Sequence, residues 1–508
     1  MIPQFAQFLS QTEVLRIHEA SLEILEEAGL LVRNSRARER MAKRGCLVDE
    51  DTGIVRLPSA LVEELCRQFP PTFTFRGRDP AFDKTLPDDA PVISTGSSAP
   101  NIIDPVTGEL RRARSDDIAR IAHLVNELDG YDVFSISTLA DDAPEGQFSL
   151  SRFYPALKNC LKPVRTAVLN PEEALQVLEL GELIAGSKGA YWERQFITFG
   201  ACNIVSALTM DYDSTEMWMF FNDRDVPVYG GIAPISGLNY PFTLPGTLAL
   251  ANAEWLAQAC FAQINREHTP LIYIHQPVVA DMRTGAYASG GIELGMQSAA
   301  LAQMARFYNV PAGAYVGHTN AKTCDAQAGF EKGMGPLTAM LGGISYLKTG
   351  GLLDALMDFD FGLAVIDAEI AQMMKRIMRG TEFSEEALSL EAIKRLGPAG
   401  MYIEHPQTLA LMKETGFFPD VANRETRDEW TENGGQDAHH TALVRAREIL
   451  TRENHAVLAP EVDARIRARF AGLVAGDAMA PDGWSPPVAP RTRQHASRRR
   501  RTARSVVL

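Results

Sequence analysis

The most constraining feature of the sequence is an alternation, from about residue 91 to residue 380, of short apolar runs with longer amphipathic stretches. The apolar runs are rich in valine, isoleucine and threonine, and they read PVISTG, YDVFSIST, PVRTAVL, QFITFGA, VPVYGGIA, TPLIYIHQ, VPAGAYVGH and ISYLKTG. Strand-length runs that alternate with helix-length patterns are typical of parallel strands covered by helices. Eight such units in roughly 290 residues predict an α/β fold, a (β/α)8 TIM barrel over residues 91–380.

A doubly wound open sheet is the alternative architecture for the same alternation. Such a sheet usually carries a glycine-rich phosphate-binding turn after its first strand. The stretch STGSSAPN, which follows the first apolar run, lacks that spacing, and no P-loop occurs elsewhere. The barrel is therefore the favoured prediction.

The segments on either side of residues 91–380 follow other patterns. Residues 1–90 combine helical periodicity with a hairpin pattern around Asp51-Thr52-Gly53, which predicts an N-terminal α+β cap. Residues 381–480 contain scattered helical patterns and predict a C-terminal helical extension. Residues 481–508 are rich in proline and arginine, which predicts a disordered basic tail.

Charge and cysteine usage exclude several classes of protein. The formal net charge is −14, and the segment from Arg491 to Leu508 alone holds seven arginines and no acid, so the rest of the chain sums to −14 − 7 = −21. An acidic body disfavours nucleic acid as a partner. Six scattered cysteines without CxxC spacing, no signal peptide and no apolar run near 20 residues predict a reduced, cytoplasmic protein without membrane segments.

Reactive groups of a barrel lie at the carboxyl ends of its strands. Tyr229, Gly230 and Gly231 end the fifth run, His275 ends the sixth, and Tyr315 and His318 end the seventh. The stretch VGHTNAKTCDAQAGFEKG after the seventh run is unusually polar. Asp325 within it fits the cap of the next helix. Glu331 lies six residues further on, past the usual capping range, where it faces either the pocket or solvent. No spacing typical of metal ligands occurs, so no metal site is expected.

Several motifs, in order from about residue 17 to residue 460, together resemble the trimethylamine methyltransferase superfamily. They are IHEASLEILEEAGLLV, IVRLPSALVEELC, GRDP, GGIAPISG, LPGTLALANAEWLA, DMRTGAYASG, DAQAGFEKG and VIDAEI. The resemblance implies a (β/α)8 barrel that moves a methyl group from an amine to the cobalt of a separate corrinoid-binding protein. It therefore implies cobalamin supplied by that partner and no tightly bound cofactor.

The founding trimethylamine enzymes of that superfamily carry pyrrolysine in the barrel, whereas this chain shows only the twenty standard residues. It therefore resembles the non-pyrrolysine branch, some of whose members demethylate glycine betaine or related quaternary amines. A quaternary ammonium already has a neutral amine as its leaving group, so the protein needs only to hold the cation, direct one methyl group outward and exclude water.

A cation of this kind prefers aromatic faces or a carboxylate, and the carboxylate of a betaine prefers basic groups and loop N–H groups. The expected catalytic residues are Glu331, His275 and His318. The expected substrate-binding residues are Tyr229, Gly230, Gly231, Tyr315, Phe330, Arg283 and Asp325, and Tyr240 and Phe242 are further candidates for the aromatic cage.

Two other functions fit the same sequence. One is trimethylamine demethylation, and the other is a non-catalytic protein that binds or senses quaternary amines. A binder would need the cage but no opening for a corrinoid partner. We expect a homo-oligomer in either case.

Overall fold

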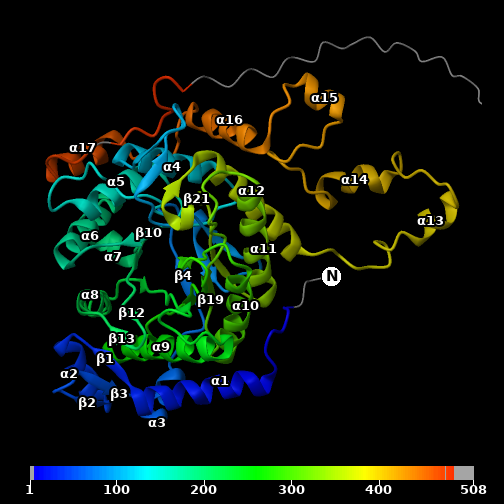
Figure 1. The fold of residues 1–508 in the computed structure, drawn as a ribbon. Helices are drawn as coiled ribbons and strands as arrows, with labels where there is room; N and C mark the ends of the chain where they lie inside the picture. Colours follow the sequence, from blue (N-terminus) through cyan, green and yellow to red (C-terminus); the bar gives the residue numbers. More distant parts are fainter. Residues whose placement is uncertain (1–4, 475, 485–508) are drawn as a thin grey trace, which may run out of the picture.

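Each of the eight apolar runs contains a strand in the computed structural model, which describes residues 5–474 and 476–484 (Figure 1). The strands are β6 (Val92–Ser94), β9 (Phe134–Ser135), β10 (Val164–Ala167), β11 (Ile197–Gly200), β14 (Val228–Tyr229), β16 (Tyr273–His275), β19 (Ala312–Tyr315) and β20 (Tyr346–Lys348). Almost every residue in them is buried, as expected for parallel strands with helices on the outside. The fold is mixed α/β.

The eight strands form two four-stranded parallel sheets, β14-β11-β10-β9 and β16-β19-β20-β6. Isolated parallel bridges connect the two sheets at both of their edges, with a further bridge from Ala99 to Thr138 beyond the ends of β6 and β9. One bridge joins Ser94, at the end of β6, to Val133, just before β9. The other joins Ile232, just after β14, to His275 in β16.

Helices follow the strands along the chain. They are α4 (Ser115–Glu127), α5 (Phe148–Asn159), α6 (Pro171–Ala185), α7 (Lys188–Glu193), α8 (Tyr212–Asn222), α9 (Leu244–Asn265), α10 (Ile292–Phe307), α11 (Ala326–Gly342) and α12 (Phe361–Arg379). The helix α9 is buried on nearly all sides because α1 (Gln11–Glu23) and α3 (Ser59–Cys66) of the N-terminal region cover it. No helix in the described residues combines the length and apolar character needed to cross a membrane.

The N-terminal region contributes three strands to a further sheet, whose other two strands follow β11. Helix α2 (Ser35–Arg44) lies beside a sheet of order β12-β13-β1-β3-β2. Its strands are β1 (Leu30–Val32), β2 (Leu47–Asp49), β3 (Ile54–Arg56), β12 (Ile204–Ser206) and β13 (Thr209–Met210). The antiparallel β2–β3 pair confirms the predicted hairpin, and Gly53 has the positive φ of 74° that its turn requires.

A hairpin of β4 (Phe73–Phe75) and β5 (Lys84–Leu86) fills the interior between the two parallel sheets. The Phe75 ring lies 4.9 Å from the Tyr346 ring and 5.8 Å from the Tyr229 ring. Side chains of a strand alternate between its two faces, so Ile272 and Ile274 of the β16 segment point into this interior cluster, and Tyr273 and His275 point outward. The interior therefore has an apolar, aromatic floor.

The loops after the strands carry additional short elements. They are β7 (Asn101–Ile103), β8 (Leu110–Arg112), β15 (Ile235–Ser236), β17 (Val278–Asp281), β18 (Ala286–Tyr287), β21 (Leu352–Leu353), β22 (Asp358–Phe359) and a 3-10 turn at Asp354–Leu356. The N-terminal region has a π-helical turn at Ile24–Ala28 and a 3-10 turn at Pro80–Phe82. The β17–β18 hairpin contains the DMRTG motif at its turn.

The C-terminal region contains two kinds of helix. Helix α16 (Ala438–Leu450) packs on α12 and α4, and α17 (Pro460–Arg469) packs on α6. Helices α13 (Leu390–Leu396), α14 (Pro406–Thr415) and α15 (Arg427–Glu432) contain no buried residue, and Figure 1 shows α13 and α14 extending away from the body.

The predicted disordered tail falls largely outside the described residues, from residue 485 onward. Residues 481–484 differ from that expectation, because Trp484 is buried and its ring lies 5.6 Å from the Phe361 ring. An aromatic ring packed in this way contributes to the fold, so the packed body extends past the boundary that composition indicated.

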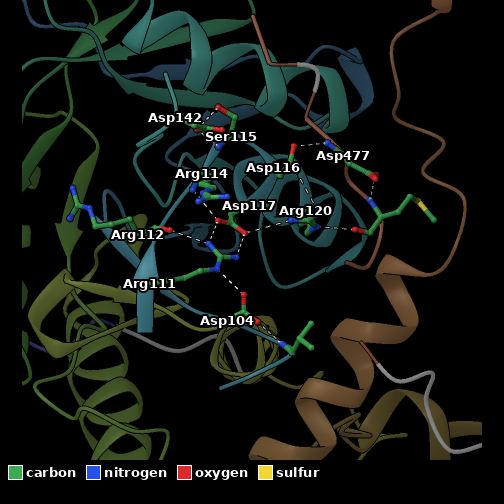
Figure 2. A network of polar contacts seen from close by, with 12 residues as sticks. Asp104, Arg111, Arg112, Arg114, Ser115, Asp116, Asp117, Arg120, Asp142 and Asp477 are labelled. Carbon is green, nitrogen blue, oxygen red and sulfur yellow. Dashed lines mark hydrogen bonds and ion pairs between the residues drawn. The ribbon is translucent and has the colours of Figure 1, made fainter. Parts of the chain in front are cut away.

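A network of ion pairs ties the start of α4 to the β7–β8 hairpin and to the C-terminal segment (Figure 2). Asp117, whose side chain is 2% exposed, accepts hydrogen bonds from Arg111 Nη1 at 2.7 Å and Nη2 at 2.9 Å. It also accepts from the backbone N–H of Arg114 at 2.9 Å. Beyond it, Asp116 accepts from the Asp477 N–H at 3.1 Å, and Arg120 donates to the Met479 carbonyl at 2.9 Å.

This network predicts that Asp117→Ala lowers the free energy of unfolding by about 2–3 kcal/mol, because removing a buried carboxylate leaves its donors unpaired. Asp141→Ala is the matched control, since Asp141 is half exposed and its contact with Arg112 is 3.3 Å long; a surface pair of this kind contributes about 0–1 kcal/mol. Chemical denaturation of both variants is the measurement. Equal losses would contradict the assignment.

Candidate active site

Four polar side chains from four strands and one from the loop after β6 form a hydrogen-bonded chain at the carboxyl ends of the strands. Arg165 of β10 donates from Nη1 to Ser135 Oγ of β9 at 3.2 Å. Ser135 Oγ donates to Ser97 Oγ, in the loop after β6, at 3.1 Å. Lys348 of β20 donates from Nζ to the same Ser97 Oγ at 2.7 Å. Tyr315 of β19 closes the circle through a hydrogen bond with Arg165. We call Ser97, Ser135, Arg165, Tyr315 and Lys348 the mouth ring.

Two tyrosine faces in and below the mouth ring already carry cations of the protein. The Arg165 guanidinium lies 4.7 Å from the centre of the Tyr229 ring, and Lys348 Nζ lies 4.3 Å from the centre of the Tyr315 ring. Tyr229 also shares a 2.9 Å hydrogen bond with Tyr346 in the aromatic floor. The faces that sequence analysis assigned to a substrate cation are therefore occupied by Arg165 and Lys348.

Glycines at the strand ends make room for the mouth ring. A Cβ atom on Gly200 would lie 2.0 Å from Arg165 Nη2, and one on Gly231 would lie 2.6 Å from the Tyr315 ring. A Cβ on Gly230 would lie 2.0 Å from the Ala201 carbonyl oxygen. Gly230 and Gly231 thus border the ring, where they allow close packing of the chain.

His275 lies on the outer face of its strand. Its Nε2 lies 3.2 Å from the carbonyl oxygen of Ala251 in α9, and its Nδ1 has no partner among the described residues. Burial lowers the pKa of His275 to about 3, against a weaker opposing effect of the hydrogen bond. The structure places this imidazole between β16 and α9 and not in the mouth ring.

His318 is buried in the loop after β19, and neither ring nitrogen has a partner among the described residues. Burial, and after it the charges of Lys332 and Lys348, hold the pKa of His318 well below its usual value. The imidazole is therefore neutral near pH 7. Unpaired buried nitrogens are rare in folded proteins, so His318 remains a candidate for contact with a ligand.

Glu331 and Asp325 act on the loop and helix around them. Glu331 accepts from Thr319 Oγ1 at 2.5 Å, from the Asn320 N–H at 2.9 Å and from Gln327 Nε2 at 3.0 Å. These bonds hold the loop that follows His318. Asp325 caps α11 by accepting from the N–H groups of residues 327 and 328 at 2.8 and 3.2 Å. The capping interpretation of Asp325 is therefore confirmed.

Two other residues predicted from sequence lie apart from the mouth ring. Arg283 is at the turn of the β17–β18 hairpin, where its side chain is 88% exposed and forms an ion pair with Asp281 at 2.6 Å. Phe330 lies on the outer side of α11 and is 56% exposed. The sequence D-M-R-T-G explains why Arg283 lies at a turn. Asp281 accepts a hydrogen bond from the Arg283 N–H at 2.9 Å, and Gly285 has the positive φ of 72° that such a turn uses.

The charged members of the mouth ring, Arg165 and Lys348, were not among the expected site residues, although Lys348 lies at the end of the eighth apolar run. A signal was present, because arginine in PVRTAVL and lysine in ISYLKTG stand inside runs that predict buried strands. Charged side chains are almost never buried without a specific role. A charged residue within a run that predicts a buried strand was thus the signal that could have indicated these two side chains.

A further cavity of the protein lies away from the mouth ring. A cavity of about 350 Å³ is lined by residues that precede β11, β14 and β16, among them Gln195, Val226 and Pro270. It therefore lies toward the amino ends of the strands, opposite the carboxyl ends at which barrel enzymes hold their reactive groups. The described residues contain no group of three or more His, Cys, Asp or Glu side chains arranged to hold a metal ion.

Comparisons with known proteins agree over nearly the whole chain. The family description "Trimethylamine methyltransferase (MTTB)" matches residues 2–472. A glycine betaine methyltransferase of Desulfitobacterium hafniense is 29% identical over 93% of this chain and 98% of its own length. A trimethylamine methyltransferase from the same species is 28% identical over 90% and 92%. A dihydropteroate synthase structure from Coxiella burnetii has a TM-score of 0.37 at 13% identity, covering 60% of this chain and 97% of its own, which is too low to bear on the fold.

The position of His275 predicts a specific pH dependence of stability. Its pKa of about 3 in the folded protein lies below the value of about 6.5 in an unfolded chain, so the unfolded state binds more protons between these values. The contribution of His275 to stability is complete above pH 6.5 and is lost as the pH falls toward 3.

We expect the difference in unfolding free energy between the wild type and His275→Gln to change by about 1.4 kcal/mol per pH unit between pH 6 and pH 4. Glutamine keeps a donor for the Ala251 carbonyl but does not titrate in this range. Denaturation curves at a series of pH values provide the measurement. Curves for the two proteins that stay parallel would show that the imidazole is not buried in the neutral form.

Proposed function

This chain is a methyltransferase of the trimethylamine methyltransferase (MTTB) family, and from that premise we propose that its substrate is a betaine-like quaternary amine. The methyl acceptor in this proposal is the cobalt of a corrinoid carried by a separate protein. The chain itself holds no tightly bound cofactor in this account, and the reaction takes place in the cytoplasm.

The proposed architecture is a closed (β/α)8 barrel. The two parallel sheets and the bridges at both of their edges support this closure. The succession of strands around the circle follows their order in the chain, as such a barrel requires. The mouth ring then lies at the carboxyl-terminal end of the barrel, the end at which barrel enzymes hold their substrates.

The observation that carries the choice of a quaternary amine is the lack of a proton donor at the mouth ring. Burial and the charge of Arg165 hold the pKa of Lys348 well below its usual value, and His318 is likewise neutral. Burial raises the pKa of Tyr315 well above the physiological range. None of these groups is an acid strong enough to protonate an amine leaving group at neutral pH.

The leaving group decides what the protein must supply. A tertiary amine that lost a methyl cation would leave as an amide anion unless it were first protonated. A quaternary ammonium leaves as a neutral amine, because the electron pair of the broken N–CH3 bond stays on nitrogen while the corrinoid supplies the pair for the new Co–CH3 bond. The residues of this chain then need only to bind, orient and exclude water.

The corrinoid protein would approach from the exposed side of the mouth ring. Cys202, in the loop after β11, is exposed, and it lies close enough to contribute to the pKa values of Arg165, Tyr315 and Lys348. The substrate methyl group would face that side. We also propose that the chain forms a homo-oligomer, which is compatible with this direction of approach.

A methyl-transfer assay tests the proposal. The purified protein is mixed with cob(I)alamin and with glycine betaine, proline betaine, carnitine, choline or trimethylamine, and formation of methylcobalamin is followed in the visible spectrum. We expect transfer from at least one quaternary amine, and transfer from trimethylamine at least tenfold slower, a difference of about 1.4 kcal/mol in the barrier.

Two results would contradict the proposal in different ways. Equal or faster turnover of trimethylamine would indicate trimethylamine demethylation, the activity named for one of the relatives. Binding of quaternary amines without transfer, even with an added corrinoid protein, would indicate a binder or sensor.

A further inference from the structure

The mouth ring and its neighbour Arg152 bury three basic side chains. Arg165, Lys348 and Arg152 are exposed by only 4%, 1% and 4% of their surface. Within residues 5–474 and 476–484, no carboxylate lies within ion-pair distance of any of them. Isolated charges in a protein interior cost several kcal/mol unless a counter-ion or a set of hydrogen bonds compensates them.

Other buried lysines of the same chain are fully compensated. Lys332 forms an ion pair with Asp367 at 2.9 Å and donates to the Gly317 carbonyl at 2.8 Å. Lys162 donates to three backbone carbonyls, each at 2.8 Å. Among the residues that the structure describes, Lys348 Nζ has a single hydrogen-bond acceptor, Ser97 Oγ. The fold therefore satisfies buried ammonium groups where they have a structural role, and Lys348 is the exception among these three.

The two arginines also retain unused donors. Arg165 Nε and Arg152 Nε are buried and have no partner among the described residues. The other nitrogens of Arg152 donate hydrogen bonds to Ser98 Oγ and Thr166 Oγ1, both at 2.7 Å, and to the Ala167 carbonyl. Its orientation is thereby fixed by the protein. Arg165 is held only by Ser135 and by tyrosines, so its guanidinium is the one with capacity for an anion.

We propose that Arg165 and Lys348 form the subsite for the carboxylate of the substrate, so that the protein selects quaternary amines that carry an anionic group. This inference rests on the proposed function, in that it names the part of the substrate which the mouth ring holds. The anion supplies the counter-charge that the fold lacks. The quaternary nitrogen would then lie on the side of the carboxylate that faces away from the two cations, toward the exposed side at Cys202.

Binding of an anion should also change the protonation of Lys348. The charged and titratable groups around it are Arg165 from β10, Arg152 from α5, Tyr315 from β19, His318 after β19 and Cys202 after β11. Burial and the two arginines hold its pKa well below the usual value. A carboxylate beside Nζ stabilises the ammonium form and raises that pKa, and we therefore expect binding to be accompanied by proton uptake.

The subsite predicts which quaternary amines are rejected. Choline and tetramethylammonium have the cationic group without the carboxylate. They would place a positive charge next to Arg165 and leave the buried donors unpaired. A site built around a polar group discriminates strongly against analogues that lack it, for this reason.

The test separates binding from methyl transfer by using 3,3-dimethylbutanoate, which has the shape and carboxylate of glycine betaine but carbon in place of nitrogen and so no transferable methyl group. Calorimetry of the full chain measures its affinity and, from enthalpies in two buffers of different ionisation enthalpy, the proton uptake. We expect binding with uptake of a proton in the wild type. We expect Lys348→Met and Arg165→Met to weaken it at least tenfold, the first without proton uptake.

Lys322→Met and Arg112→Met are the matched controls, since both side chains are mostly exposed and form surface ion pairs. They should bind like the wild type. Thermal unfolding without ligand separates a binding role from a structural one. A buried amine with one hydrogen-bond acceptor contributes little to stability, and its replacement by an apolar side chain is neutral or stabilising. Lys348→Met should therefore unfold at the same temperature as the wild type or higher.

The subsite would be overturned if the wild type did not bind 3,3-dimethylbutanoate. It would also be overturned if Lys348→Met and Arg165→Met both kept the wild-type affinity within twofold. Lower thermal stability of Lys348→Met without ligand would overturn it as well, because it would show a structural role. Failure of the proposed function looks different: binding and its loss in the variants would persist, while no methyl group is transferred from any betaine. Transfer from choline as fast as from glycine betaine would leave the function intact and refute the subsite.

Discussion

The arrangement of the site depends on one energetic constraint, which is the burial of basic side chains at the ends of parallel strands with no carboxylate partner among the described residues. Arg165 and Lys348 stand where the aromatic floor below them excludes water. Serine hydroxyls and tyrosine faces compensate them in part. A hydroxyl or an aromatic face has no net negative charge, so partners of this kind do not neutralise a buried cation as a carboxylate would.

The rest of the interior is organised so that this arrangement can persist. The β4–β5 hairpin, which comes from the N-terminal region, supplies Phe73 and Phe75 as the floor against Tyr229 and Tyr346. Gly200 leaves the space that Arg165 occupies. Other buried charges have partners within the protein: Asp117 pairs with Arg111, Lys332 pairs with Asp367, and Lys162 donates to three backbone carbonyls. Arg165 and Lys348 differ from them, and we assign their unused capacity to a ligand.

The sequence was sufficient to predict the eight strands, the β2–β3 hairpin and the cap at Asp325, because each has a strong local pattern. It was insufficient for the face on which a strand-end residue lies. Side chains alternate along a strand, so a shift of one position moves a residue to the other side; His275 follows an inward-facing Ile274 and packs against α9. Long-range packing of Trp484 likewise left no local pattern to detect.

A crystal structure of the protein with glycine betaine is the most direct test of the central claim, that the basic side chains of the mouth ring, Arg165 and Lys348, hold the anionic end of the substrate. The account predicts carboxylate oxygens within hydrogen-bond distance of the Arg165 guanidinium and of Lys348 Nζ, with the trimethylammonium group on the side of Cys202. A betaine with its carboxylate on other groups, or with its ammonium against Arg165 and Lys348, would contradict it.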